Sequence, residues 1–530
     1  MNNRSAIYPI LNTIPEERQK LARYYGVHPY FTRRSANVIQ TYIKRFTQAG
    51  DTVCDPFGGT GVTAIEALLL GRKAIHNDLN PFANFMAEVV GDTSLESVSP
   101  LSEEFAKMET TCREKIREIE KATDGRISKM LKEVRLPENI HLPKNSDAKT
   151  YYELFTPKQL LGLATLKEYI DSIKNRTVRN VMLLAWCASM AKLNKTFISA
   201  KGRAESRGGS SIFSIYRYKV AKQNVELPIW ETYKGRFDNL LVAKKEVIAE
   251  KEVFNSTKQN EFKIDSKQNM RIYSVDVCTL PEVIGEGSVD YIYTDPPYGG
   301  HIAYLDLSIM WNHWLGFTIS EKRRSEEAIV GGELGLSESH YLSKLEKSVD
   351  ACFKLLKKDR WISIVFQHWN SAYFKAIIQT ASNLGGDLRA AITQERDVVW
   401  SMHKKKNAES VLAAEMVLTF YNPKKRAKYI QPITNETQLE IEELLEMVLL
   451  ESHANKKEDV LSSDYLFNQV ILMALHTNSL STLEVPRDRF VEYMKKKGWT
   501  YNIDYHGWNK CEPNVYYAQV NKHKQGRINF

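Results

Sequence analysis

Residues 51–81 read DTVCDPFGGTGVTAIEALLLGRKAIHNDLNP, and this stretch decides the fold. Its pattern predicts a short strand over Thr52–Asp55, a glycine loop, a helix over Val62–Leu70 that ends at Gly71, and a second strand over Lys73–Asn77. A strand, a glycine loop, a helix and a second strand form the opening unit of a doubly wound sheet. We therefore expect an α/β protein with a Rossmann-like core.

Strand-like runs return much later in the chain. They lie at Arg271–Val277, Val289–Thr294, Trp361–Phe366 and Glu415–Tyr421. The residues between the second and third strands, 96–265, instead carry apolar side chains at helical spacing. The sheet is thus predicted to be interrupted by a largely helical insertion and then completed.

The final 105 residues carry no motif to which chemistry can be assigned, and we expect a small, α-rich accessory domain that begins with an acidic helix over Glu436–Leu450. The expected parts are 1–95 (first half of the core with the cofactor loop), 96–265 (helical insertion), 266–425 (second half of the core) and 426–530 (C-terminal accessory domain).

Composition and charge narrow the class of protein. Of 530 residues, 43% are apolar and 26% are charged, which is ordinary for a globular protein with more than one structural unit. The chain has no apolar run long enough to span a membrane, and its first residues lack the order of a signal peptide, so we expect a cytoplasmic protein with no membrane partner. The net charge of +9 suits a polyanionic partner.

The cysteines show no close pair at metal-ligand spacing, so neither a disulfide framework nor a metal site is expected. They are Cys54, Cys112, Cys187, Cys278, Cys352 and Cys511.

The loop after the first strand has the composition of a ligand cradle. Glycines let the backbone approach a ligand, and the helix N-terminus behind them presents free N–H groups. The pattern Gly59-x-Gly61-x-x-Ala64, with Asp78 after the second strand, fits either a dinucleotide or S-adenosylmethionine. An acid directly before the loop would repel a pyrophosphate but would attract the ammonium of a methionine moiety. Asp55 therefore favours S-adenosylmethionine.

The segment VDYIYTDPPYGG (289–300) holds the candidate catalytic residues, Asp295-Pro296-Pro297-Tyr298, at the carboxyl end of a strand. Ligands bind at this end of strands in open α/β sheets. An exocyclic base amine is a poor nucleophile because its lone pair is delocalised into the ring. The Asp295 carboxylate and the Pro296 carbonyl can accept its hydrogens and localise that lone pair toward a methyl sulfonium. Such a base must be flipped out of its duplex, and Tyr298 offers it a stacking face.

Together these segments resemble the amino-methyltransferases of DNA, the N6-adenine and N4-cytosine group. The resemblance rests on the residues Asp55-Pro56-Phe57-Gly58-Gly59-Thr60-Gly61 with Thr63, and Asp295-Pro296-Pro297-Tyr298. It extends to HPYFTRRS (28–35), to Asp276 in YSVDV, and to the strands within 357–370 and 414–423. About 20–95 and 270–423 are covered.

The resemblance implies a site-specific, S-adenosylmethionine-dependent DNA methyltransferase that needs no metal. Asp rather than Ser at position 295 favours adenine N6 as the target. A prokaryotic restriction-modification or defence role, with a restriction or defence-system protein as partner, is also implied. The residues that match cofactor motifs are Asp55, Pro56, Phe57, Gly58, Gly59, Thr60, Gly61, Thr63, Asp78 and Asp276.

The insertion contains the region that we expect to read the target. Residues 192–219 hold seven Lys/Arg and one acid, with aromatic residues such as Phe213 and Tyr218 interleaved. This composition fits either a solvated loop or a surface for phosphates and bases. The candidates for DNA contacts are Lys192, Lys195, Lys201, Arg203, Arg207 and Arg217. Trp311 and Trp314, in contrast, are expected to pack a helix onto the sheet.

Four other functions remain alternatives. An N4-cytosine methyltransferase would use the same mechanism. The tRNA guanine-N2 methyltransferases pair similar motifs but usually carry an N-terminal RNA-binding domain, and only about 25 residues precede the core here. A dinucleotide-dependent oxidoreductase would have no use for the tetrapeptide at 295–298. Intact Asp55, Asp295 and Tyr298 count against a non-catalytic DNA-binding module on a decayed methyltransferase fold.

Overall fold

The structure is a computed structural model. It describes residues 8–17, 20–31, 33–198, 209–220, 226–257, 262–300, 302–368, 370–394, 415–424, 441–455, 461, 463–476, 487–502 and 507–509. Two compact units form. The first comprises Met1–Ile10, Pro15–Ile364 and Phe420–Lys424, and the second comprises Leu11–Ile14, Val365–Thr419 and Lys425–Phe530. The four-part division of the sequence stays a prediction.

A seven-stranded sheet has the strand order β5-β2-β1-β6-β7-β9-β8. The strands are β1 (Thr52–Asp55), β2 (Lys73–Asn77), β5 (Met270–Tyr273), β6 (Val289–Thr294), β7 (Leu356–Phe366), β8 (Asp387–Gln394) and β9 (Glu415–Asn422). β1 pairs in parallel with β2 and β6, β2 with β5, and β6 with β7. The order reverses between β1 and β6, and such a reversal leaves a ligand crevice at the carboxyl ends of the strands. The predicted doubly wound, Rossmann-like sheet is therefore confirmed.

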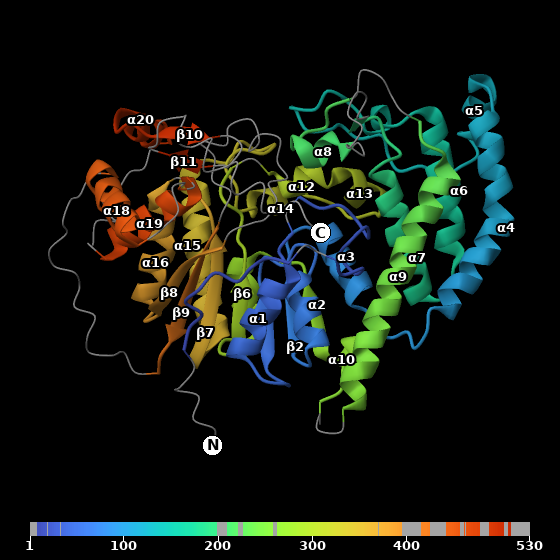
Figure 1. Cartoon of the computed structure of the whole chain (residues 1–530). Helices are drawn as coiled ribbons and strands as arrows, with labels where there is room; N and C mark the ends of the chain where they lie inside the picture. Colours follow the sequence, from blue (N-terminus) through green and yellow to red (C-terminus); the bar gives the residue numbers. More distant parts are fainter. Residues whose placement is uncertain are drawn as a thin grey trace, which may run out of the picture. The chain divides into compact units, whose positions relative to one another are not determined.

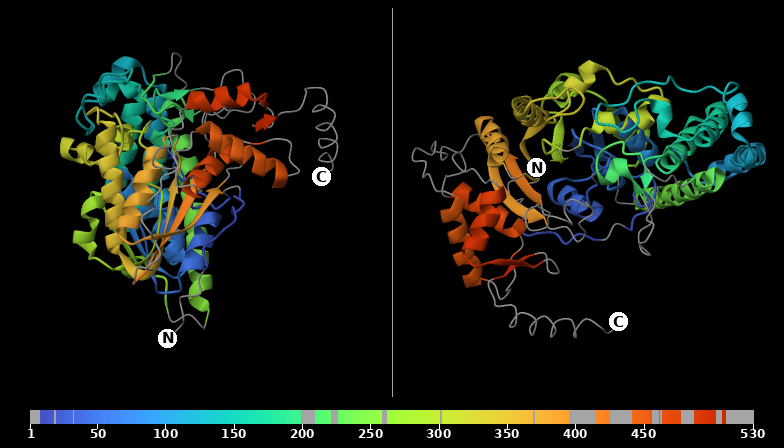
Figure 2. Two further views of the ribbon diagram at one scale, coloured as in Figure 1. Left: turned by 90° about the vertical axis from the view of Figure 1, so that its left-hand side faces the viewer. Right: turned by 90° about the horizontal axis from the view of Figure 1, so that it is seen from above.

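Helices cover both faces of this sheet in the first unit. α1 (Ala36–Phe46) and α2 (Val62–Leu69) lie on one face, and α15 (Glu338–Leu355) lies on the other (Figures 1 and 2). α2 is buried along its whole length because its residues are nearly all apolar. α3 (Pro81–Gly91) follows β2, and Asn80 caps it by accepting a hydrogen bond from the backbone N–H of Phe82.

The strand predictions were closest where the strands are wholly buried. β1, β2 and β6 have the predicted bounds. β5 ends at Tyr273 rather than Val277, because the Asp276 carboxylate caps the 3₁₀ turn η3 (Val277–Thr279) by accepting from the N–H of Cys278 at 3.1 Å. β7 starts at Leu356, five residues before its predicted start, and β8 was not predicted.

The largely helical insertion is confirmed between β2 and β5. Its long helices stand beside the sheet in Figure 1. They are α4 (Ser99–Lys121), α6 (Pro157–Ser172), α7 (Arg176–Met190) and α9 (Ile229–Ser256), and the short α5 (Asp124–Met130) follows α4. Shorter elements are η2 (Tyr151–Leu154), β3 (Phe197–Ile198), β4 (Gly209–Ser210), α8 (Ser211–Ser214) and α10 (Ser266–Asn269).

A buried arginine joins the insertion to the core. Arg23 Nε donates to Glu66 Oε1 on α2 at 2.7 Å, and its Nη1 pairs with Glu246 and Glu250 on α9. Neither the Arg23 nor the Glu66 side chain has exposed surface. Because a buried charge is costly unless it is paired, this network fixes α9 against the helix that follows the glycine loop.

Short helices flank β6 in the chain. α11 (Leu280–Ile284) precedes it, and α12 (Tyr304–Leu307), α13 (Ile309–Trp314) and α14 (Glu321–Ser325) follow it. Trp311 and Trp314 on α13 are buried, as predicted. Trp311 stacks on Phe82 of α3 at 5.2 Å, and its Nε1 donates to the Cys187 carbonyl of α7 at 3.0 Å. The tryptophans thus pack against helices rather than strands.

The second unit contains α16 (Ser371–Asn383), α18 (Ile441–Asn455), α19 (Ser463–His476), α20 (Arg487–Lys496) and an antiparallel pair, β10 (Thr500–Asn502) and β11 (Gly507–Asn509). The indole N–H of Trp508 donates to Ser463 Oγ at 2.8 Å, which ties β11 to α19. The α-rich C-terminal part is confirmed. Its predicted acidic helix corresponds to α18, and residues 436–440 lie outside the described residues.

Within the described part of the chain, the five cysteines are free, and four of them are buried. No group of His, Cys, Asp and Glu side chains suited to a metal ion occurs among the same residues. None of the described helices is long and apolar enough to cross a membrane.

Candidate active site

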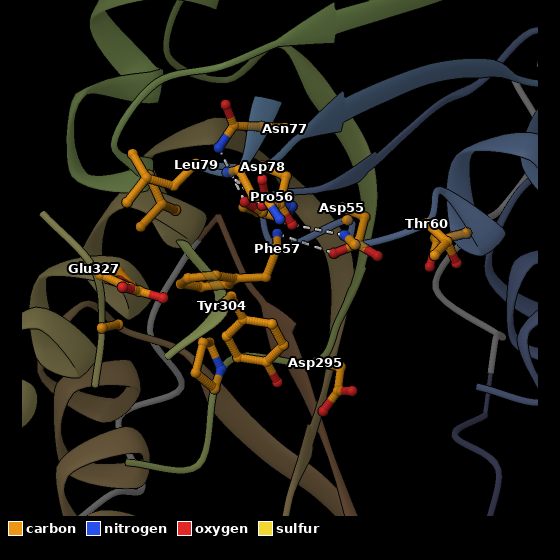
Figure 3. A pocket seen from close by; sticks show the side chains of 18 of the residues that line it. Asp55, Pro56, Phe57, Thr60, Asn77, Asp78, Leu79, Asp295, Tyr304 and Glu327 are labelled. Carbon is orange, nitrogen blue, oxygen red and sulfur yellow. Dashed lines mark hydrogen bonds between the residues drawn. The ribbon is translucent and has the colours of Figure 1, made fainter. Parts of the chain in front are cut away.

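A cavity lies where β1, β2 and β6 end. It measures about 960 Å³ with its open mouth, and the first unit supplies all of its lining. The candidate site residues on its wall are Asp55, Pro56, Phe57, Gly58, Gly59, Thr60, Thr63, Asp78, Asp276, Asp295 and Pro297 (Figure 3). The two motifs, more than 230 residues apart in the chain, thus share one wall.

Gly61 is not a lining residue of the cavity; it is the N-cap residue of α2 and has a φ of +83°. A Cβ at this position would lie 2.6 Å from the Cβ of Ala87 on α3. Glycine is therefore required both by the left-handed backbone and by the close approach of the two helices. The loop is held in shape by the Gly59 N–H, which donates to Asp78 Oδ2 at 2.8 Å.

Asp55 is 5% exposed at the end of β1. Its Oδ1 accepts from Thr294 Oγ1 at 2.9 Å and from the Phe57 N–H at 3.2 Å. Burial raises the pKa of its carboxyl to about 7, although the hydrogen bonds from Thr63 and Thr294 act in the other direction. A positive charge in the cavity would favour the ionised form of this carboxyl.

Two more acids on the cavity wall share this property. Burial raises the pKa of the Asp78 carboxyl to about 6, against the hydrogen bonds from the backbone N–H groups of Asn80 and Gly59. Burial and the neighbouring Asp306 raise the pKa of the Glu327 carboxyl to about 8. Three acids whose ionisation is opposed by burial therefore line one cavity.

Asp276 is paired inside the protein. It lies at the start of η3, and Lys344 on α15 forms an ion pair with its Oδ2. Both residues line the cavity.

At the end of β6, Asp295 is bound by two side chains. Arg34 Nε donates to Asp295 Oδ2 at 2.6 Å, and the Tyr298 hydroxyl donates to Asp295 Oδ1 at 2.7 Å. Arg34 Nη2 also donates to the Tyr298 hydroxyl. Two residues after Asp295, the carbonyl of Pro297 accepts a hydrogen bond from the Tyr341 hydroxyl at 2.7 Å, which fixes the tetrapeptide to α15. Pro296 lies between these anchored residues.

Sequence reasoning missed several residues of the cavity wall. Arg34 lies within the segment HPYFTRRS, which carries part of the resemblance. The sequence therefore points to this segment, but it does not predict the contact between Arg34 and Asp295. Tyr30 comes from the same segment. Tyr304, Glu327 and Lys344 follow the tetrapeptide in the sequence, and no local pattern distinguishes them.

The candidate DNA-contacting residues lie only partly within the described structure. Lys192 and Lys195 are half-buried, and Arg217 is exposed and ion-paired with Asp147. Lys201, Arg203 and Arg207 lie outside the described residues.

Tyr218, one of the interleaved aromatic residues, is 1% exposed, and its hydroxyl donates to the Leu307 carbonyl at 2.8 Å. It therefore packs in the core and offers no face to a base.

Comparison with known proteins finds a family model and a relative that each match a small part of the chain. Residues 2–87 match the family model described as DNA methylase, of the N6/N4 methyltransferase type. The type II methyltransferase M.MjaII of Methanocaldococcus jannaschii is 32% identical over 73 residues. That alignment spans only 14% of this chain and 14% of that protein.

Among solved structures, the rRNA methyltransferase aviRa from Streptomyces viridochromogenes aligns with 76% of this chain and 94% of its own, at 10% identity and a TM-score of 0.26. The two sequence matches support the predicted resemblance to the DNA amino-methyltransferases, and the family model places it over residues 2–87, which include the glycine loop but not the tetrapeptide at 295–298.

Proposed function

We propose that this chain transfers a methyl group from S-adenosylmethionine to the exocyclic amine of a flipped DNA base, with adenine N6 as the target. The observation that carries the proposal is the single cavity on whose wall the glycine loop, Asp55 and Asp78 lie together with Asp295. Support for DNA as the substrate comes from the family match over residues 2–87.

The residues of the cavity fit this cofactor. A sulfonium and an ammonium are both cationic, and burial raises the pKa of the Asp55, Asp78 and Glu327 carboxyls on the cavity wall. We assign Asp55 to the ammonium, Asp78 to the ribose hydroxyls and Asp276 to the adenine. Gly58 and Gly59 let the backbone approach the ligand. When bound, the cofactor supplies the electrophilic methyl group.

The residues after β6 act on the base. The Asp295 carboxylate and the Pro296 carbonyl accept hydrogen bonds from the amine, which localises its lone pair on nitrogen. Tyr298 offers a stacking face for the extruded base. The methylated nitrogen loses its extra proton to water, so no general base is assigned.

The remaining roles follow from charge and from the family. The basic residues of 192–219 would contact DNA phosphates, and the net charge of +9 favours such a partner. A restriction or defence-system protein is the partner that the family implies. The cytoplasm is the expected location for such an enzyme.

Incubation of the purified protein with tritiated S-adenosylmethionine and DNA from a strain without adenine methylation tests the proposal. Nucleoside digestion and mass spectrometry should find N6-methyladenine, and the Asp295→Ala variant should give none. N4-methylcytosine would keep the mechanism and change the base. Label in tRNA but not in DNA would replace the proposal with an RNA methyltransferase.

A further inference from the structure

We propose that Arg34 is a positioning residue that fixes Asp295 and Tyr298 as one unit for methyl transfer. The inference rests on the proposed function, because it assigns Arg34 to the same reaction. Arg34 lies 261 residues before Asp295 in the sequence, yet its guanidinium contacts both side chains.

The three side chains form a closed ring of hydrogen bonds. Arg34 donates through Nε to Asp295 Oδ2 and through Nη2 to the Tyr298 hydroxyl, which in turn donates to Asp295 Oδ1. Each contact restricts a different rotation: that of the carboxylate, that of the phenol and that of the guanidinium itself. The planar fork of arginine supplies two donors at a fixed spacing, which the single ammonium of lysine cannot reproduce.

Arg34 is itself held in place by the backbone around it. It comes directly before Ser35, the N-cap residue of α1, which buries Ala36, Val38 and Ile39 in its first turn. The neighbouring Arg33 donates to the carbonyls of Tyr24 at 2.6 Å and His28 at 2.7 Å. Only 11% of the Arg34 side chain and 19% of the Asp295 side chain are exposed. The guanidinium thus reaches the site from a fixed anchor.

The ring explains how two requirements of the reaction are met together. Asp295 must present its carboxylate to the amine, and Tyr298 must present its ring to the base. A carboxylate oxygen accepts more than one hydrogen bond, so Asp295 can hold Arg34 and still accept from the amine. Arg34 also supplies a positive charge where Asp295 and Asp55 otherwise repel each other. Without Arg34, the carboxylate and the phenol would each rotate more freely.

The test compares Arg34→Ala with Arg34→Lys, Tyr298→Phe and the Arg34→Ala/Tyr298→Phe double variant. Single-turnover methyl transfer to unmethylated DNA and the Kd for S-adenosylmethionine are measured for each. The matched control is Arg360→Ala. Arg360 Nη2 pairs with Asp290 at 2.8 Å, near the opposite end of β6, and its side chain is 17% exposed. This control removes a similar ion pair outside the cavity.

We expect Arg34→Ala to lower the single-turnover rate on the order of 100-fold, the usual cost of a misplaced reacting group. The cofactor Kd should stay within about threefold, since no cofactor contact is assigned to Arg34. Ethylguanidinium added to the assay should restore at least about tenfold of the lost rate by filling the vacated space. Arg34→Lys should recover only part of the rate. Tyr298→Phe should lower the rate less in the Arg34→Ala background than in the wild type.

A wild-type rate for Arg34→Ala in an active enzyme would overturn this assignment and leave the proposed function intact. A second outcome would also overturn it: Arg34→Ala is slow, ethylguanidinium does not rescue it, and its melting temperature falls and its cofactor Kd rises more than those of Arg360→Ala. That pattern would show that Arg34 has a purely structural role. A wild-type protein that methylates no nucleic acid would overturn the proposed function first and this assignment with it.

Discussion

Replacing Asp55 with asparagine should stabilise the free protein at high pH while weakening its affinity for S-adenosylmethionine. Burial raises the pKa of the Asp55 carboxyl from 3.8 to about 7. Between these values the folded protein holds a proton that the unfolded chain has lost, so the free energy of unfolding falls as the pH rises. Ionisation of Asp55 therefore lowers the free energy of unfolding by about 4 kcal/mol at pH 8 and by about 2 kcal/mol at pH 5. Asparagine carries no charge and avoids this penalty.

The substitution fits the hydrogen bonds around the site. The amide oxygen of asparagine can accept from Thr294 Oγ1 and from the Phe57 N–H as Asp55 Oδ1 does. The new NH₂ needs an acceptor, and leaving it unsatisfied would cost about 1–3 kcal/mol at any pH. The prediction therefore concerns the change in stability between two pH values. The increase in the free energy of unfolding caused by Asp55→Asn should be about 2–3 kcal/mol larger at pH 8 than at pH 5.

Urea unfolding of both proteins at pH 5 and pH 8 measures this difference. Because the chain forms two compact units, the relevant transition is the one that S-adenosylmethionine shifts in the wild type. Asp51→Asn, which alters an exposed hydrogen bond to the Gln48 N–H just before β1, should change stability equally at both pH values. A gain from Asp55→Asn that is independent of pH, or larger at pH 5, would refute the reasoning. Calorimetry should show weaker cofactor binding, and an unchanged Kd would remove Asp55 from the ammonium site.

Three further predictions concern the same cavity. Asp295→Ala should abolish methyl transfer while calorimetry still detects S-adenosylmethionine binding, and near-normal transfer would show that the catalytic site has been misassigned. Glu327→Gln should leave cofactor affinity unchanged at pH 6, because the Glu327 carboxyl is largely protonated below its pKa of about 8. As the pH rises to 9, the wild type should gain affinity for the cofactor and the variant should not. Titration calorimetry across this range would contradict a role for Glu327 in binding if both proteins gained affinity equally. Gly61→Ala should destabilise the first unit by about 1–3 kcal/mol, because the new Cβ meets Ala87 and the backbone is left-handed. A melting temperature equal to that of the wild type would show that α2 and α3 adjust freely.

The sequence predicts those parts of the fold whose signals are local. β1, β2 and β6 are fully or almost fully buried, so each reads as a short apolar run bounded by polar or turn residues. β8 has a mixed burial pattern and lacks such a signal. The end of β5 was misplaced because the Asp276 cap stops the strand, and a capping aspartate within an apolar run resembles a strand residue.

The site was predictable to the extent that parallel strands end at one edge of a sheet. Asp55 is the last residue of β1, and Asp78 and Asp295 directly follow β2 and β6, so their shared cavity follows from the topology alone. Arg34 and Lys344 reach the same place from a loop and from a helix, and no spacing in the sequence relates them to their partners. The burial that raises the pKa of Glu327 also depends on the complete tertiary structure.

The distribution of charge in the cavity suggests a common role for Arg34 and Lys344, the two residues that the sequence did not predict. Asp295 and Asp276 are neutralised by Arg34 and Lys344. Burial is the largest influence on the pKa of the other three acids, Asp55, Asp78 and Glu327, and it opposes their ionisation. The proposed reaction requires these two groups of acids to differ in this way. A catalytic acceptor must stay ionised whether or not a ligand is present, so the protein supplies its counter-charge. Asp55, which we assign to the ammonium, gains a counter-charge only when the cofactor binds, so binding of the cofactor favours its ionised form.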